Sequence, residues 1–221
     1  MANFFPKWTN QLTWKLVVCV GILGASVTAG LTYYFTPKYT RVGYQPNQPV
    51  PFSHALHVQQ LGMDCRYCHS FVEVASHSNV PTAQTCMGCH TQVKALSPKL
   101  DAVRAAWNDG KADGPPVDWV RIHQVPDYVY FNHAAHVNRG VSCYSCHGNV
   151  NDMQVVYQHE SQSMSWCLDC HREPENHLRP PSEIYNLNWK AESPQAQREM
   201  GLKFKKEWDV NPPTNCGGCH R

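Results

Sequence analysis

Ten of the eleven cysteines in this 221-residue chain form five Cys-x-x-Cys pairs, and a histidine directly follows each pair. Two thiols and an imidazole at this spacing could form a disulfide beside a histidine, bind zinc, or hold a porphyrin through two thioether bonds. In chain order, motifs 1 to 5 are Cys65/Cys68/His69, Cys86/Cys89/His90, Cys143/Cys146/His147, Cys167/Cys170/His171 and Cys216/Cys219/His220.

The adjacent histidines separate these three chemistries. Disulfides would use the cysteines and leave the five histidines without a role. Zinc sites use four cysteines, or cysteines with histidines at other spacings, and five pairs cannot be divided two by two. Covalent c-type haem uses every element, because the thiols bond to the porphyrin vinyl groups and the next histidine ligates the iron. We therefore predict five covalently bound haems c, one at each motif.

A second axial ligand is needed on each iron, and two repeated segments offer candidates. The pattern F-x-H-x-x-H occurs at residues 52–57 and again at residues 131–136. Histidines three residues apart share one helical turn and can reach different irons. We predict that His54 and His133 ligate the haems of motifs 1 and 3, and that His57 and His136 reach neighbouring haems.

The fifth distal ligand has several candidates. His123 lies shortly before the second F-x-H-x-x-H segment, and Met153 offers a thioether that would raise the reduction potential of its iron. The remaining alternatives are Met164, His77, His159 and His177. The supply of histidines suffices for every iron to be six-coordinate, whereas a haem that reacts with small molecules would keep one position open.

Composition indicates how such a chain would fold. The net charge of +2 and the pI of about 8.0 provide no basic patch for nucleic acid. Outside the apolar N-terminus, about 185 residues remain for five haems, too few for an ordinary apolar core around each one. We predict a mainly α and irregular fold with little sheet, in which the haems form the core and without which the chain does not fold.

The N-terminal residues predict a membrane anchor. Residues 16–35 contain no charge and would span about 30 Å as a helix. A cleavable signal peptide is the alternative, but this apolar run is longer than a typical signal core and lacks a good cleavage site. Because c-type haem is attached outside the cytoplasm, we expect a single-pass protein of the cytoplasmic (inner) membrane. Residues 1–15 would lie inside and residues 36–221 on the periplasmic side.

Four segments follow from these features. We predict an anchor at 1–35, a tether at 36–51, a first dihaem module with a helical connector at 52–130, and a second dihaem module with the fifth haem at 131–221. In the connector, Ser97 and Pro98 are typical of a helix start, and Val93, Leu96, Leu100, Val103 and Trp107 form an apolar stripe. Near the end, Ser193 and Pro194 predict a helix with Met200, Phe204 and Trp208 on one face.

The F-x-H-x-x-H segments resemble those of the multihaem cytochrome c3/c7 group. Together with one apolar span and five haem motifs, RIHQVPDYVYFNHAAHV (121–137), GVSCYSCHG (140–148) and MSWCLDCHREPENHL (164–178) resemble the pentahaem subunit of alternative complex III, often called ActA. This resemblance implies a subunit of a quinol-oxidising respiratory complex. It also implies as partners an iron–sulfur subunit, polytopic quinol-site subunits, a monohaem cytochrome c and a terminal oxidase.

The residues themselves point to electron transfer. We find no catalytic constellation and no motif with lysine in place of histidine, so we predict an electron-transfer subunit that is not itself an enzyme. A self-sufficient quinol dehydrogenase of the NapC/NrfH type is one alternative, although Cys65 lies thirty residues beyond the apolar span. An enzyme that reduces nitrite or another small oxyanion is the second alternative, and it would require an open iron.

Overall fold

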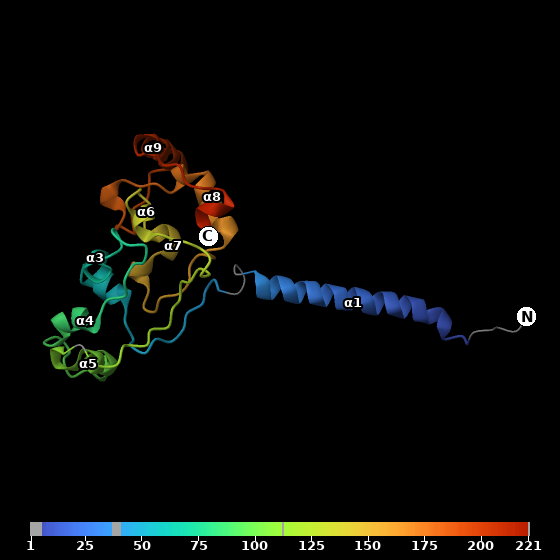
Figure 1. Cartoon of the computed structure of the whole chain (residues 1–221), viewed down its shortest axis with the longest axis horizontal. Helices are drawn as coiled ribbons and strands as arrows, with labels where there is room; N and C mark the ends of the chain where they lie inside the picture. The colour runs from blue at the N-terminus through green and yellow to red at the C-terminus, as the bar shows by residue number, and fades with distance from the viewer. Residues whose placement is uncertain (1–5, 37–40, 112, 221) are drawn as a thin grey trace, which may run out of the picture.

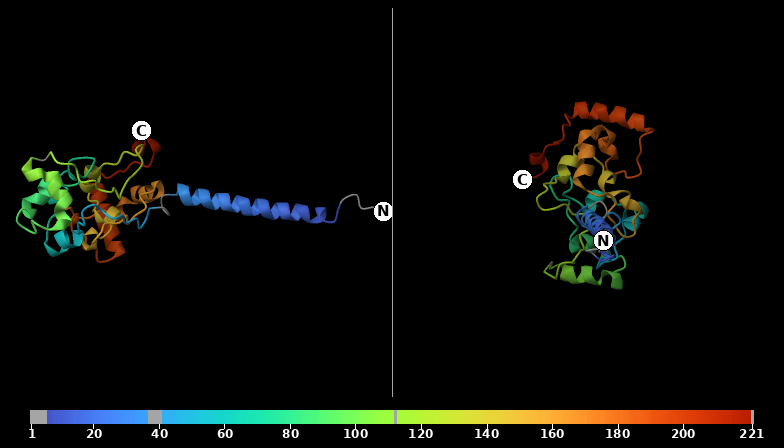
Figure 2. Two further views of the ribbon diagram at one scale, coloured as in Figure 1. Left: turned by 90° about the horizontal axis from the view of Figure 1, so that it is seen from below. Right: turned by 90° about the vertical axis from the view of Figure 1, so that its right-hand side faces the viewer.

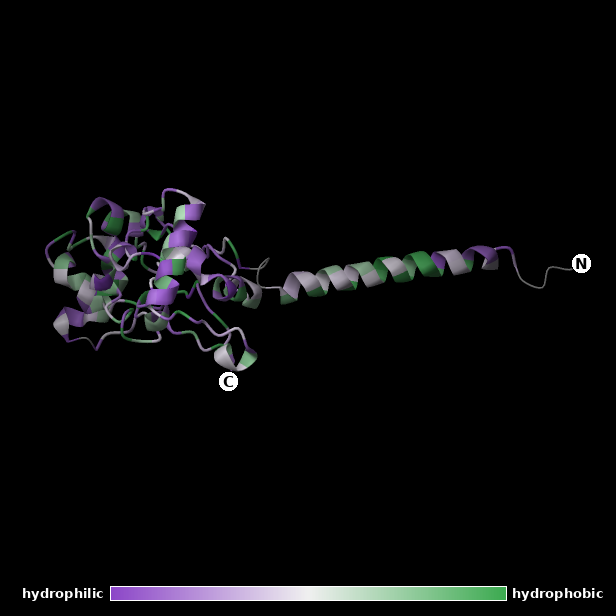
Figure 3. Cartoon of the chain, turned by 90° about the horizontal axis from the view of Figure 1, so that it is seen from above, coloured by the Kyte–Doolittle hydropathy of each residue, from purple (hydrophilic) through white to green (hydrophobic). Residues whose placement is uncertain are grey.

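A long N-terminal helix projects from a helical domain (Figure 1). The computed structural model describes residues 6–36, 41–111 and 113–220. Helix α1 runs from Thr9 to Phe35 and is long and apolar enough to cross a membrane, with a mean hydropathy of 1.9 over its most apolar window. Its central turns are the most apolar, and its N-terminal turn is hydrophilic (Figure 3). The predicted span at 16–35 lies within α1, which fits a single-pass membrane protein.

The side chains of α1 are available to lipid or to other helices. No residue of α1 is buried, and Val20, Ile22 and Leu23 expose more than 60% of their surface. Thr28 and Thr32 donate their hydroxyl protons to carbonyl oxygens one turn earlier, at 2.8 and 2.9 Å, so neither hydroxyl is left unpaired. At 1.5 Å per residue, this 27-residue helix is about 40 Å long.

Short helices and loops make up the domain. In chain order the helices are η1 (Ala55–Gln60), α3 (Cys65–Cys68), α4 (Ala83–His90), η2 (Pro98–Leu100), α5 (Asp101–Trp107), η3 (Asn108–Gly110), α6 (His133–Val137), α7 (Tyr144–His147), η4 (Val150–Asp152), α8 (Met164–Arg172), η5 (Pro174–Asn176), η6 (Pro181–Glu183), α9 (Pro194–Glu207) and α10 (Cys216–Cys219). The described residues form no strand, only isolated bridges between Val129 and His220 and between Val141 and Leu178. The predicted mainly α and irregular fold is confirmed.

Apolar packing in the domain is limited to small clusters. Val50, Met87 and Val103 form one buried cluster, and Val72, Val137 and Ile184 form another. Outside α1, several large apolar side chains remain exposed, among them Phe71, Val74 and Leu96. The protein side chains therefore build only a small core of their own, as expected if a large cofactor contributes to it.

The connector helix is shorter than the predicted stripe. Leu100, Val103 and Trp107 pack in the first cluster, but Val93 and Leu96 are 57% and 93% exposed. The prediction for these two residues is wrong because α4 ends at His90 and Lys94 adopts a positive φ of 51°. That left-handed conformation interrupts the helix before the new start at Pro98.

The second predicted helix is confirmed as α9. The Ser193 hydroxyl caps it by accepting from the Ala196 amide at 3.1 Å, and Phe204 stacks on Trp208 with ring centroids 4.3 Å apart. Helix α9 packs on η5, where the buried carboxylate of Glu175 accepts from Lys205 at 2.9 Å. Gly201 permits this approach, because a Cβ there would overlap the Glu175 carbonyl group.

Residues 41–50, which precede the first module, are irregular and contact the second half of the chain. Within the predicted tether, residues 37–40 are outside the described residues. The Gly43 amide donates to the Gln158 carbonyl at 2.8 Å, and the Gln158 amide donates back to Tyr44 at 3.0 Å. The Gln48 side chain pairs with both backbone groups of Val120, at 2.9 and 3.0 Å. Residues 43–48 are therefore attached to the domain by hydrogen bonds.

Candidate functional site

Every Cys-x-x-Cys pair lies on or at the start of a short helix. In α3, Asp64 caps the turn by accepting from the Arg66 amide at 2.8 Å, and in α10 Asn215 accepts from the Gly218 amide at 2.9 Å. Side chains three residues apart lie on the same face of a helical turn, so each turn presents its two thiols together. All eleven cysteines lie in the described residues, and no two of them form a disulfide there.

Four of the five motif histidines are held in one orientation. In each of these four, Nδ1 donates to a backbone carbonyl, which leaves Nε2 as the nitrogen with a lone pair for a metal. The acceptors are Asn79 for His69 (2.7 Å), Val93 for His90 (2.8 Å), Pro213 for His171 (2.7 Å) and Tyr128 for His220 (3.3 Å).

The two F-x-H-x-x-H segments have the same local geometry. Phe52 meets His54 edge-on at 4.8 Å and stacks on His57 at 4.5 Å, with interplanar angles of 90° and 27°. Phe131 repeats this with His133 and His136 at 4.7 and 4.6 Å, with angles of 89° and 26°. Sequence alone predicted no role for the two phenylalanines, although their repetition in both segments was a signal for one. Each phenylalanine ring fixes the orientation of two imidazoles.

Each segment also orients its second histidine toward a motif histidine. His57 Nδ1 donates to the Ser53 carbonyl at 2.9 Å, and His136 Nδ1 donates to the Asn132 carbonyl at 2.7 Å. The ring centroids of His57 and His90 are 6.2 Å apart, and those of His136 and His171 are also 6.2 Å apart. The described structure thus contains two facing pairs of imidazoles, one at motif 2 and one at motif 4.

This spacing matches the two axial ligands of one haem iron. Ring bonds of about 1.35 Å place each imidazole atom about 1.15 Å from the ring centre. With metal–nitrogen bonds of about 2.0 Å, two imidazoles on opposite faces of one iron have centres about 6.3 Å apart. The donor set and its spacing therefore fit a bis-histidine haem at each of these two positions.

A third group of histidines is buried near motifs 1 and 3. Burial, followed by neighbouring imidazoles with His123 first, lowers the pKa of His147 to about 3. Burial, followed by the nearby His69 and His57, lowers the pKa of His54 to about 4. Burial lowers the pKa of His123 to about 4. These imidazoles are neutral at pH 7, the state in which imidazole ligates a metal.

The candidates for the fifth distal ligand differ in their surroundings. His123 Nε2 is buried without a hydrogen-bond partner, and its ring lies 4.3 Å from that of His147. Met153 is 6% exposed, whereas Met164 is 67% exposed. His159 Nε2 lies 3.6 Å from the Glu160 carboxylate, and His77 Nδ1 is 3.0 Å from the Ser76 hydroxyl. The described residues pair no second imidazole ring with His220, so its distal ligand stays unassigned.

The motif thiols also influence one another across motifs. For four of them in the free state, the pKa is raised first by burial and then by a thiol of another motif. For Cys68 these neighbours are Cys86 and Cys89, for Cys143 it is Cys65, for Cys146 they are Cys170 and Cys167, and for Cys167 it is Cys219. The five motifs therefore lie close together in one continuous group.

Comparison with known proteins agrees with this geometry. The family described as "Cytochrome c7 and related cytochrome c" matches residues 50–106 and 129–221, which include all five motifs. The chain belongs to this cytochrome c family. Its members carry covalent haem c, and Cys-x-x-Cys-His motifs have the thiols that such attachment would use. His123 lies between the two matched segments, and α1 lies before them.

A curated relative gives this cytochrome a more specific context. The chain is 32% identical over 154 residues to "Menaquinone reductase, multiheme cytochrome c subunit" from Nitratidesulfovibrio vulgaris. The match covers 61% of this chain and 71% of the relative. Together with the family match, it supports a multihaem electron-transfer subunit of a membrane complex related to a quinone reductase.

Proposed function

We propose that this cytochrome is the pentahaem electron-transfer subunit of a membrane respiratory complex, similar to that of alternative complex III. It would pass electrons from quinol oxidation toward a periplasmic cytochrome c or a terminal oxidase, without a catalytic site of its own. The observation that carries the proposal is the facing imidazole pairs at 6.2 Å, next to two of five Cys-x-x-Cys-His motifs. Each bound haem c would supply an iron that alternates between the ferric and ferrous states by accepting one electron.

The residues divide into three roles in this proposal. The ten motif cysteines attach the porphyrins, and the five motif histidines are the proximal ligands. His57 and His136 are the distal ligands at motifs 2 and 4, and His54 and His133 serve motifs 1 and 3. His123, whose Nε2 is buried and unpaired, and Met153 are the candidates for the fifth distal ligand, and His123 lies beside motif 3, with its ring 4.3 Å from that of His147.

The membrane arrangement follows from α1 and from the chemistry of haem attachment. Helix α1 would anchor the subunit in the inner membrane with the haem domain on the periplasmic side. The exposed apolar surface of α1 would contact lipid and polytopic quinol-site subunits, and the domain would contact an iron–sulfur subunit and a monohaem cytochrome c. Quinol oxidation in those partners releases two electrons and two protons, and only the electrons enter this subunit.

The relative favours a second candidate that differs in the direction of electron flow. Its printed name is that of a menaquinone reductase subunit, in which electrons end on the quinone. This chain could serve such a complex with the same ligands, because a row of ferric/ferrous irons conducts in either direction. The reduction potentials of the partners determine the direction.

Purification through a C-terminal tag tests the proposal. We expect five haems per chain by pyridine haemochrome, together with an iron–sulfur subunit and polytopic subunits in the same preparation. The matched control replaces α1 by a cleavable export signal; it should keep five haems and lose the polytopic subunits. Full-length protein that purifies as a monomer without partners would contradict the proposal.

Two further measurements distinguish the alternatives. If the isolated subunit oxidises quinol by itself, the protein is a NapC/NrfH-type dehydrogenase. If the reduced protein binds carbon monoxide or shows a high-spin haem by electron paramagnetic resonance, one iron is open, as a small-oxyanion reductase requires.

A further inference from the structure

We propose that the five motifs form one unbranched row in the order 2–1–3–4–5, which differs from their order in the sequence. Motif 2 lies at the end far from α1, and motif 5 lies on the side from which α1 emerges. This inference rests on the proposed pentahaem function and specifies the path that it would use. Four contacts, each between neighbouring motifs of the row, support it.

Motifs 1 and 2 contact each other through residues that lie between the two cysteines of each motif. Tyr67 of motif 1 faces Gly88 of motif 2, with its hydroxyl 3.7 Å from the position of a Cβ on Gly88. His57, eight residues before motif 1, pairs with His90 of motif 2. The Cys68 thiol has Cys86 and Cys89 as its electrostatic neighbours. Motif 2 is thus adjacent to motif 1.

Motifs 1 and 3 meet through reciprocal backbone hydrogen bonds. The Ala55 amide donates to the carbonyl of Met153, six residues after motif 3, at 3.1 Å. The equivalent Ala134 amide donates to the carbonyl of Ala75, six residues after motif 1, at 3.2 Å. Equivalent residues of the two repeats thus exchange equivalent contacts, as across a twofold interface.

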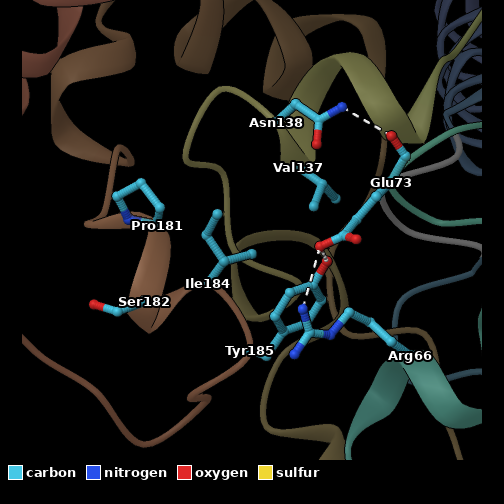
Figure 4. Close-up of a pocket in the computed structure, with 8 residues that line it drawn as sticks. All are labelled: Arg66, Glu73, Val137, Asn138, Pro181, Ser182, Ile184 and Tyr185. Atoms are coloured by element: carbon cyan, nitrogen blue, oxygen red, sulfur yellow. Dashed lines mark hydrogen bonds and ion pairs between the residues drawn. The ribbon is translucent and has the colours of Figure 1, made fainter.

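Side chains reinforce this junction. Glu73, which follows motif 1, accepts from the Tyr185 hydroxyl at 2.8 Å and lies 3.6 Å from the Arg66 guanidinium (Figure 4). The side-chain amide of Asn138 donates to the backbone carbonyl of Glu73 at 2.8 Å. This hydrogen bond lies at the edge of a pocket of about 310 Å³ (Figure 4). Arg66 belongs to motif 1 itself, so this polar cluster joins motif 1 to the second half of the chain.

The remaining two contacts extend the row from motif 3. His136, seven residues before motif 3, pairs with His171 of motif 4, and the Cys146 thiol has Cys170 and Cys167 as neighbours. His171 then donates to the carbonyl of Pro213, three residues before motif 5, at 2.7 Å. A Cβ on Gly218 of motif 5 would overlap Pro213, so motif 5 packs directly against this segment.

Exposure and position identify the two ends. Of the ten motif cysteines, only Cys89 of motif 2 and Cys216 of motif 5 are exposed, and the other eight are partly buried. Helix α4, which carries motif 2, lies at the part of the domain farthest from α1, and the C-terminus lies nearer to α1 (Figures 1 and 2). The row therefore has one accessible end on the side of the predicted membrane and the other on the far side.

Photoinjection of electrons from either end tests the order. A ruthenium photosensitiser with a sacrificial amine donor is attached to Leu96→Cys, six residues after motif 2, or to Asn211→Cys, five residues before motif 5. Both residues are exposed, and Cys19→Ser removes the remaining free thiol. In each labelled holoprotein a distal-ligand change, His57→Met for motif 2 or His54→Met for motif 1, raises the potential of one haem and makes it a spectroscopic reporter.

The expected result is a reversal of arrival times. From position 211, the His54→Met reporter is reduced before the His57→Met reporter, and from position 96 the order is the opposite; motifs in their sequence order would give the His57→Met reporter first from both labels. The same arrival order from both labels, or equal times throughout, would overturn the row. A preparation with fewer than five haems per wild-type chain would instead refute the pentahaem function, so the two failures are distinguishable.

A second measurement avoids the methionine reporters. A nitroxide at position 96 or 211 is relaxed by a nearby ferric haem. Loss of the motif 2 haem through Cys86→Ala/Cys89→Ala should slow the relaxation at position 96 only. Loss of the motif 5 haem through Cys216→Ala/Cys219→Ala should slow it at position 211 only. An effect of either deletion on the opposite label would contradict the assignment of the ends.

Discussion

Replacing His57 by alanine should convert one of the five proposed haem irons from six-coordinate low spin to high spin. The rings of His57 and His90 are 6.2 Å apart, and the two ligands of one iron require about 6.3 Å. Among the described residues, no other imidazole both stacks on Phe52 and faces His90, so alanine at position 57 leaves that iron without its distal ligand. Since each motif contributes one iron, about a fifth of the ferric low-spin signal should become high spin.

Electron paramagnetic resonance and absorbance of the purified ferric holoprotein measure this fraction. His136→Ala should give the same loss at motif 4, and the double variant about two fifths, because the two pairs share no residue. Gln60→Ala, an exposed change on the same η1 helix, is the control and should leave every iron low spin. Imidazole added to the solution should restore the low-spin signal of both histidine variants.

Two results would refute this reasoning. An unchanged low-spin fraction in His57→Ala would show that His57 is not an axial ligand despite its distance from His90. A loss of several haems at once would show that the residue supports the fold of the whole domain and not one iron.

Further predictions concern the fold and the unassigned ligand. Gly201→Ala should lower the free energy of unfolding by about 1–2 kcal/mol, because its Cβ overlaps Glu175, while Gly217→Ala should be nearly neutral; thermal melts of the holoprotein measure both. Lys205 holds the pKa of Glu175 below its usual value, so this carboxylate stabilises the fold above about pH 4.5 and ceases to do so as acid protonates it. Glu175→Gln should therefore cost about 1–3 kcal/mol at pH 7, and its difference from wild type should shrink toward pH 3. His123→Ala should leave one high-spin iron whereas Met153→Leu should not; the reverse outcome would assign the thioether. Blocking haem attachment should leave the domain unfolded by circular dichroism.

The local features of the site were predictable from sequence because they depend on near neighbours. The five motifs, the repeated F-x-H-x-x-H turns and the Ser193 cap each involve residues within a few positions. Val93 and Leu96 show the limit of this reasoning. Their spacing continues the apolar stripe of the connector. However, α4 ends at His90, and the positive φ of Lys94 prevents one continuous helix from including both residues and the new start at Pro98.

The arrangement of the motifs was not predictable, because it depends on contacts far apart in sequence. The Ala55–Met153 and Ala134–Ala75 hydrogen bonds join residues that no local pattern relates. The same holds for the contact of Gly43 and Tyr44 with Gln158. A single sequence contains no signal for such pairs. Only the repeated spacing indicated that equivalent residues of the two F-x-H-x-x-H segments would make similar contacts.

The repeat and the reciprocal contacts together account for the proposed order. In each module, the second histidine of F-x-H-x-x-H faces the later motif: His57 faces motif 2 and His136 faces motif 4. The two modules meet through equivalent backbone groups near their first motifs. Motifs 1 and 3 therefore lie next to each other in the row, and motifs 2 and 4 lie on the outer sides of this pair.

Motif 5 extends only one side of this symmetric centre. The backbone amide of Tyr130, the residue directly before the second F-x-H-x-x-H segment, donates to the Cys219 carbonyl of motif 5 at 2.9 Å. The sequence has no sixth motif that could make the equivalent contact before the first F-x-H-x-x-H segment. The fifth site therefore lengthens the row on the side of α1. A duplicated two-haem unit joined through its first motifs, with one added motif, produces the order 2–1–3–4–5 without any further assumption.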